Sequence, residues 1–214
     1  MSDMVDDRAT IVASGTGRVT LAPDLADLRI GVAVSRPTVD AARAEAARLM
    51  EAILGAVDAA GVARRDVRTA LLSVQPRYEY RDDRAPTLVG YELNNVIEVT
   101  VRDLARLGDV VDGTLGAGAT SMDSLSFRSA DPSGAEREAR IVAMTQARTR
   151  ADVLAEAAGL TILGVGEVVE GTGGQPPGPR PGSERMLMAA DVATPLEPGS
   201  LEIAVGVSVT YRAR

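Results

Sequence analysis

An unbroken alternation near the end of the chain constrains the fold more than any other feature. From Leu201 to Tyr211 every second residue is a large apolar one, and a shorter stretch at 27–34 alternates in the same way. A period of two puts one row of side chains on a buried face of a β-strand and the other row on the opposite face. The core is therefore expected to rest on amphipathic strands that are covered on one side.

A helix is predicted directly after the strand expected at 27–34. Apolar residues recur every three or four positions in 35–61, with Ser35 as the expected cap and Pro37 in the first turn. A shorter helix is predicted over 103–116 on the same grounds. Both segments have one apolar stripe, which predicts that they pack on the sheet.

A third and longer helix is rich in alanine. Asp131 followed by Pro132 predicts its start, and Gly159 predicts its end. Its apolar positions form a face of small residues, which permits a close approach to a sheet or to another helix. The expected face consists of Ala135, Ala139, Val142, Ala143, Leu154 and Ala158.

The order of elements gives the fold class. Further strands are predicted at 11–21, 67–80, 93–101, 125–127 and 162–169. Pro76 predicts that its strand lies at a sheet edge or ends there. Residues 24–129 then read β-α-β-β-α-β, the ferredoxin-like split pattern, and the long helix and two strands follow. We expect an α+β protein with a mainly antiparallel sheet and helices packed on one side.

One domain over 10–214 is expected, preceded by a disordered tail at 1–9. Within that domain, nine of the 14 residues in 171–184 are Gly or Pro. Such a composition does not support a regular element, so this segment is predicted to be a flexible loop.

The amino-acid composition limits the kinds of catalysis and binding that the chain can support. The chain has no His, Cys, Trp or Lys, and all 23 basic residues are Arg. Those four types supply most catalytic nucleophiles and bases and the soft metal ligands. The formal net charge of −7 argues against a nucleic-acid partner, which normally requires a basic face. We expect no enzyme activity, no catalytic residues and no cofactor.

Two glycine pairs and several carboxylates are candidates for a nucleotide-binding loop and for a metal site. Gly15 and Gly17 lack the third glycine and the following helix of a dinucleotide loop, and the pair Gly164 and Gly166 fails in the same way. Bulges or turns are the better interpretation of these glycines. The acidic residues of 24–27 and 82–83 lack the spacing of a calcium loop, so no metal site is expected.

The residues best suited to an interaction surface fall in two places. Three tyrosines surround the predicted turn at 81–86, where they could cap the end of the sheet or line a small pocket or an interface. An apolar segment beside the flexible loop could pack in the core or form an adaptable contact. The candidates are Tyr78, Tyr80, Tyr91, Met186, Leu187 and Met188.

The cellular location follows only from what the sequence as written contains. The first residues show no basic region followed by an apolar run, and no stretch of 18 apolar residues occurs. We expect a cytoplasmic protein without a membrane span, or a periplasmic one if a leader has been removed.

Several phrases, taken in order, resemble the SIMPL family, named after a signalling molecule that associates with a pelle-like kinase. The family includes the bacterial periplasmic immunogenic proteins. The matching phrases are GTGRVTLAPDLADLRIGV at 15–32, QPRYEY at 75–80, GYELNNVIEVTVRDLARLGDVVD at 90–112, LSFRSADPSGAEREAR at 125–140, AEAAGLTILGVGEVVEG at 155–171 and TPLEPGSLEIAVGVSVTY at 194–211. The resemblance implies an α+β fold and, for some members, large ring-like or channel-like homo-oligomers. It implies no established enzymatic activity.

These observations lead to one expectation and two alternatives. The favoured interpretation is a non-catalytic homo-oligomeric assembly or scaffold protein. The first alternative is a monomeric or small-oligomer binding module for a protein or a small molecule. The remote alternative is a hydrolase that uses paired carboxylates.

Overall fold

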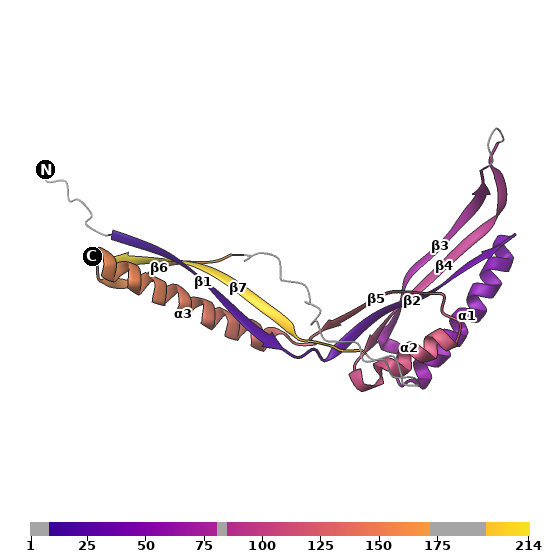
Figure 1. Ribbon diagram of the computed structural model, residues 1–214, viewed down its shortest axis with the longest axis horizontal. Coiled ribbons are helices and arrows are strands. Elements are labelled where there is room, and N and C mark those ends of the chain that lie inside the picture. Colours follow the sequence, from indigo (N-terminus) through magenta and orange to yellow (C-terminus); the bar gives the residue numbers. More distant parts are fainter. Residues whose placement is uncertain (1–8, 81–84, 172–195) are drawn as a thin grey trace, which may run out of the picture. The chain divides into compact units, whose positions relative to one another are not determined.

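A computed structural model describes residues 9–80, 85–171 and 196–214 (Figure 1). Nearly all of the predicted tail and of the predicted loop at 171–184 lies outside the described residues, as do Asp82 and Asp83. The elements are β1 (Ala9–Leu21), β2 (Leu25–Arg36), α1 (Val39–Ala59), η1 (Arg64–Asp66), β3 (Val67–Glu79), β4 (Thr87–Val101), η2 (Leu104–Arg106), α2 (Leu107–Gly116), β5 (Ser121–Arg128), α3 (Ser133–Ala158), β6 (Ile162–Gly171) and β7 (Leu201–Ala213).

The α+β class is confirmed: the strands form antiparallel sheets on which helices pack. The strands divide into two sheets that belong to two compact units. The first unit contains β1, α3, β6 and β7, and the second is Pro23–Arg128 together with the residues just before Gly199.

The second unit has the predicted β-α-β-β-α-β order. Its four strands lie in the order β3-β4-β2-β5, so β4 inserts between the two strands that α1 connects, as the split pattern requires. Pro76 lies in β3, which is an edge strand, and the prediction of an edge position is confirmed.

The core of this unit is aliphatic and lies between the sheet and its helices. Helix α1 packs on the central strands β2 and β4 and also contacts α2. Each Val, Leu or Ile that is fully buried here contributes about 1.5–3 kcal/mol to stability. The core includes Leu28, Ile30, Val32, Ile53, Val57, Ile97, Val99, Val101, Leu107 and Val110. Strand β3 lies outside this cover, and most of its residues are exposed.

The start of α1 differs from the prediction. Ser35 still belongs to β2, where it pairs with Glu92, and the N-cap is Thr38. The Thr38 hydroxyl accepts a hydrogen bond from the backbone N–H of Ala41 at 3.2 Å. The prediction of a Ser35 cap was therefore wrong, because β2 extends further than its alternating residues indicate.

The first unit is a three-stranded sheet in the order β1-β7-β6, with α3 on one face. The buried face of α3 is a row of alanines at every fourth position: Ala139, Ala143, Ala147, Ala151 and Ala155. The predicted small-residue face is right for Ala139 and Ala143 but wrong for Val142 and Leu154, which are 41% and 49% exposed. On the helix side all the buried residues are alanines, whereas the strands contribute larger side chains such as Val209 and Tyr211 to the same core.

Glycines on β1 make that short separation possible. A Cβ atom on Gly15 would lie 2.0 Å from the carbonyl oxygen of Ala143, and one on Gly17 would lie 1.8 Å from that of Ala139. Strand β1 pairs with β7 without a register shift. The prediction that Gly15 and Gly17 mark a bulge or a turn was therefore wrong. They are required because the backbone of α3 touches the strand. The pair at 164 and 166 does coincide with irregular pairing in β6.

Side chains of α3 also occupy the outer edge of β1. The Gln146 amide oxygen accepts a hydrogen bond from the backbone N–H of Thr16 at 2.8 Å. The Arg150 guanidinium donates to the backbone oxygen of Ser14 at the same distance. Backbone groups that an edge strand leaves unpaired are thus satisfied within the unit, which protects this edge from pairing with another chain.

Replacement of Gly15 by alanine should destabilise the first unit strongly. The new methyl group would collide with helix backbone, which cannot rotate away, so we expect a loss of about 3 kcal/mol or more in urea-induced unfolding. Gly164→Ala in β6 is the matched control, because its Cβ would meet only a side-chain atom of Arg212 at 3.8 Å. Equal stability of the two variants would contradict the close contact between α3 and β1.

Candidate interaction surface and binding groove

The three candidate tyrosines lie toward the free end of the β3–β4 hairpin. Tyr78 pairs with Leu88, and Tyr91 pairs with Pro76. Tyr80 directly follows β3 and is 77% exposed. The structure thus brings the tyrosines to one hairpin. The other candidates, at 186–188, lie outside the described residues.

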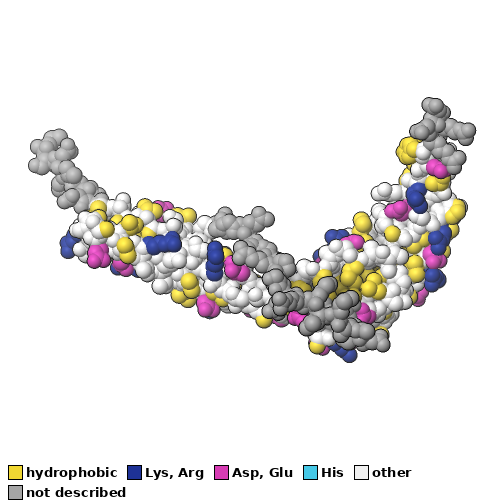
Figure 2. All heavy atoms as spheres, viewed as in Figure 1, with side chains coloured by type: hydrophobic (Ala, Val, Ile, Leu, Met, Phe, Trp, Pro, Cys, Tyr) yellow, Lys and Arg dark blue, Asp and Glu magenta, His cyan; other side chains and the backbone are white. Residues whose placement is uncertain are grey.

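Strand β3 continues this surface as an exposed apolar edge. Its regularly paired stretch from Leu71 to Arg77 carries no charged side chain before Arg77. Figure 2 shows hydrophobic side chains along the hairpin, within the half of the molecule that contains β3 and β4. The exposed apolar residues on β3 and β4 are Leu71, Leu72, Val74, Tyr78, Leu88 and Val89. We call this set the β3 surface. Sequence reasoning missed its aliphatic members, although the edge position of Pro76 pointed to the strand.

A groove lies beside the β3 surface, between α1 and the start of β3. It has a volume of about 660 Å³. The apolar lining residues lie at the edge of the hydrophobic core. The charged lining residues come from α1 on one side and from residues 64–68 on the other. The lining residues are Ala47, Met50, Glu51, Leu54, Gly55, Val57, Asp58, Val62, Arg64, Val67, Arg68, Thr69, Asn95 and Ile97. No sequence motif indicated this groove, because it exists only where α1 leaves β3 uncovered.

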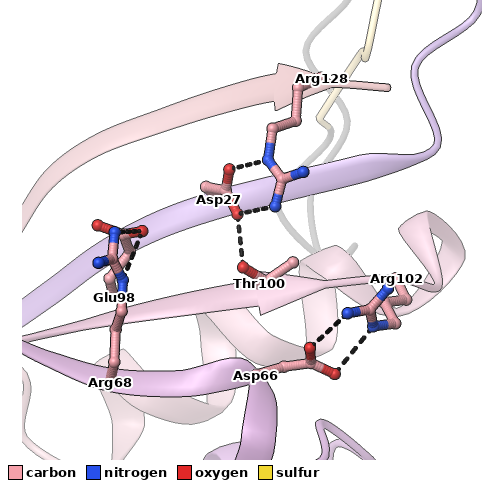
Figure 3. A network of polar contacts seen from close by, with 7 residues as sticks. All are labelled: Asp27, Asp66, Arg68, Glu98, Thr100, Arg102 and Arg128. Carbon is pink, nitrogen blue, oxygen red and sulfur yellow. Dashed lines mark hydrogen bonds and ion pairs between the residues drawn. The ribbon is translucent and has the colours of Figure 1, made fainter. Parts of the chain in front are cut away.

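Ion pairs and hydrogen bonds between side chains join neighbouring strands of the same unit (Figure 3). The Asp27 carboxylate on β2 accepts hydrogen bonds from the Thr100 hydroxyl on β4 at 2.6 Å and from the Arg128 guanidinium. Arg68 and Glu98 form an ion pair across β3 and β4 at 2.6 Å. These contacts join neighbouring strands.

A further ion pair joins η1 to the residue after β4. The Arg102 guanidinium donates two hydrogen bonds to the carboxylate of Asp66, whose side chain is largely buried (Figure 3). These bonds lower the pKa of Asp66. At Asp27, partial burial raises the pKa, but the hydrogen bonds from Arg128 and Thr100 outweigh it, so the pKa is lowered overall. Both carboxyls are therefore charged at neutral pH and act as structural links.

Among the described residues, no three Asp or Glu side chains converge in a way that could hold a metal ion. In the same ranges, no helix is long and apolar enough to cross a membrane.

Asp27 should make the fold acid-sensitive. A carboxyl with a lowered pKa in the folded state stabilises it above the unfolded pKa of about 4, and this contribution is lost as the pH falls through the folded pKa. Asp27→Asn should cost about 1–2 kcal/mol at neutral pH and flatten the decline in stability below about pH 4. Urea unfolding between pH 2 and pH 7 measures both effects. Asp152→Asn, which breaks an exposed pair with Arg148, is the control and should change little.

Comparison with known proteins relates nearly the whole chain to one family. Residues 11–211 match the family model described as SIMPL, protein of unknown function (DUF541). The 26 kDa periplasmic immunogenic protein of Brucella melitensis is 32% identical over an alignment of 223 positions, which covers 100% of this chain and 88% of that protein.

Two further relatives are described as uncharacterized protein YggE. The Escherichia coli protein is 34% identical over 145 positions, which cover 68% of this chain and 58% of that protein. The protein of Edwardsiella ictaluri is 30% identical over 152 positions, covering 71% of this chain and 64% of the relative. Because the family model spans both structural units, the chain belongs to the SIMPL family.

Proposed function

We propose that this chain is a non-catalytic protein that assembles with copies of itself, and that the subunits pair through the edge of β3. The observation that carries the proposal is the contrast between two edge strands. The edge of β1 receives hydrogen bonds from Gln146 and Arg150, whereas between Leu71 and Pro76 no side chain of the described residues donates a hydrogen bond to the backbone of β3 or accepts one from it. A long uncapped edge with apolar side chains is a template for pairing with another strand.

The composition of β3 supports self-pairing. Between Leu71 and Pro76 the strand carries no charge that would repel a second copy, and Leu72 is 64% exposed. An isologous pair would bring the same apolar side chains together from both subunits. Pro76 cannot donate a backbone hydrogen bond, so it limits how far such pairing can extend.

Strand β6 is the competing edge. It also exposes apolar residues, among them Leu163 and Val168. Both edge strands show two register shifts, but those of β3 leave the uninterrupted run Leu71–Arg77, whereas those of β6 leave only Glu167–Gly171, which carries Glu167 and Glu170. Bulges and charges are the devices by which proteins prevent pairing at an edge, so β3 is favoured over β6.

A scaffold role without catalysis agrees with the composition of the chain, which has no His, Cys or Lys and would have to rely on Asp, Glu, Ser, Thr or Tyr for catalysis. The family and the relatives named above are of unknown function or uncharacterized, apart from the immunogenic protein. For the location, the description of the Brucella relative as a periplasmic protein supports the periplasmic alternative over the cytoplasmic one. Fractionation of the native host decides between them.

Charge placed on β3 should dissociate the assembly. We expect the unmodified protein to be oligomeric by light scattering at micromolar concentration, and the double variant Leu72→Lys, Val74→Lys to be monomeric. Burying two ammonium groups at a strand interface is far more costly than leaving them in water.

The matched control is Val168→Lys on β6, a similarly exposed apolar residue on the other edge. It should remain oligomeric. A strict monomer for the unmodified chain would remove the proposal, and dissociation by the β6 variant alone would move the interface to that edge. Circular dichroism checks that each variant is folded.

A further inference from the structure

The backbone of β3 specifies how two copies of this edge can pair, because only alternate residues of an edge strand have backbone groups that point outward. The alternation can be followed across the sheet from the β5 side (Figure 1). The backbone oxygen of Gly31 on β2 accepts a hydrogen bond from the N–H of Thr120 at 3.0 Å, and the N–H of Ala33 donates to the Thr120 hydroxyl at 2.6 Å. The N–H and C=O groups of one strand residue point to the same side. Those of Gly31 and Ala33 therefore face β5, and those of Val32, between them, face β4.

The same alternation continues through β4 to β3. Strands β2 and β4 pair without a register shift, and Val32 lies opposite Asn95. The backbone groups of Asn95 therefore face β2, and those of Asn94, the residue before it, face β3. Asn94 lies opposite Ser73. The backbone groups of Ser73 are thus used inside the sheet, whereas those of the residues on either side of it point outward.

The outward residues in the regular stretch of β3 are Leu72, Val74 and Pro76. The proline agrees independently with this alternation, because it has no backbone N–H and is tolerated in a paired strand where that group would face solvent. Leu72 and Val74 each present a donor and an acceptor to a partner strand, and Pro76 presents only an acceptor. Its ring occupies the place of the missing N–H, so a partner backbone fits poorly opposite Pro76.

These groups leave one favourable register for an antiparallel pair of identical edges. A two-fold axis at Ser73 places Leu72 opposite the partner's Val74 and the converse, and each of these pairs exchanges two backbone hydrogen bonds. An axis at Val74 or at a later residue up to Pro76 places the proline ring against the partner's backbone, so carbonyl groups would face a ring instead of an N–H. An axis at Leu72 sets Val74 against the register shift that precedes Leu71.

We propose that two subunits join at β3 in an antiparallel pair with the two-fold axis at Ser73. This inference rests on the proposed self-assembly through β3 and adds its geometry. The regular outward stretch is short, and the bulge before Leu71 and the ring of Pro76 end it on both sides. The pairing is therefore confined to one register rather than free to slide along the strand.

The apolar side chains of β3 agree with this register. Val74 lies opposite Leu93 on β4, which belongs to the core, so Val74 and Leu72 point to the face of the sheet on which α1 packs. In the subunits described here they are 44% and 64% exposed. Two contacts between Leu72 and the partner's Val74 would continue the apolar row of the core from one subunit into the other.

The opposite face of the strand supplies the positions for a test. The two copies of Ser73 would face each other across the axis in a pair without hydrogen bonds, with Cα atoms about 4.5 Å apart. Leu71 would face the partner's Gln75. The two copies of Gln75 would lie about 13 Å apart, because four residues at about 3.3 Å each separate them along the strands.

Disulfide formation tests the register directly, because the chain has no cysteine of its own. A disulfide spans Cα separations of about 4.4–6.8 Å, so a Ser73→Cys variant oxidised with diamide should give a covalent dimer on a denaturing gel. Gln75→Cys, on the same face of the same strand, is the matched control and should remain a single chain. A mixture of Leu71→Cys and Gln75→Cys should cross-link, although neither variant does so alone.

The outcomes separate the register from the assembly. Cross-linking in a mixture of Ser73→Cys and Gln75→Cys, without a Ser73→Cys homodimer, would move the axis to Val74 and overturn the register while β3 remains the interface. An oligomer by light scattering that forms none of these cross-links would overturn both the register and the use of β3. A strict monomer would remove the self-assembly and the register with it.

Val74→Pro tests the outward alternation by a second route. It removes an N–H that the sheet does not use, so the thermal midpoint should change little. The dissociation constant of the dimer should rise at least about tenfold, because two backbone hydrogen bonds are lost. Ser73→Pro is the comparison: it removes an N–H directed at β4 and should lower the thermal midpoint. Unchanged dimerisation of a folded Val74→Pro variant would contradict the register.

Discussion

The contact between the alanine row of α3 and the glycines of β1 is the constraint on which the first unit depends. Only 2% of the residues are aromatic, and Tyr211 on β7 is the one aromatic side chain in the core of this unit, so rings fill little of the space between helix and sheet. The gap is closed by bringing the backbones together, with no Cβ on Gly15 and Gly17 and only methyl groups on the helix. The same proximity lets Gln146 and Arg150 reach the edge of β1. The close approach of α3 to β1 therefore explains both the packing of this unit and the protection of its β1 edge.

In the second unit, the described residues provide no comparable protection for the β3 edge between Leu71 and Pro76. Helix α1 covers β2 and β4 and ends short of β3, so the outer strand is exposed on its faces and along its edge. This incomplete cover produces two features beside β3. The strand edge offers backbone hydrogen bonds to another strand, and the uncovered side toward α1 forms the groove.

The glycines of this chain differ in what surrounds them. At Gly15 a side chain is excluded by the protein's own backbone, which explains the residue completely. At Gly55 in α1 and Gly134 in α3 the described structure leaves open space, so no contact within the fold requires a glycine there. The ion pairs show a comparable division. Asp27 and Asp66 are held by arginines within the fold, whereas Arg64 in the groove has no partner among the described residues.

Sequence alone determined the elements, their order and the fold class, because periods of two and of three to four residues report directly which side chains are buried. It also placed Pro76 on an edge strand and identified the family. It could not place the strands in two sheets, since pairing of β1 with β7 joins residues from opposite ends of the chain. The starting residue of α1 and the true contact face of α3 were also outside its reach. Of the candidate site, the tyrosines could be found near one turn, but the aliphatic edge of β3 and the groove could not. Both arise from where α1 stops covering the sheet, a property of tertiary packing that no local pattern encodes.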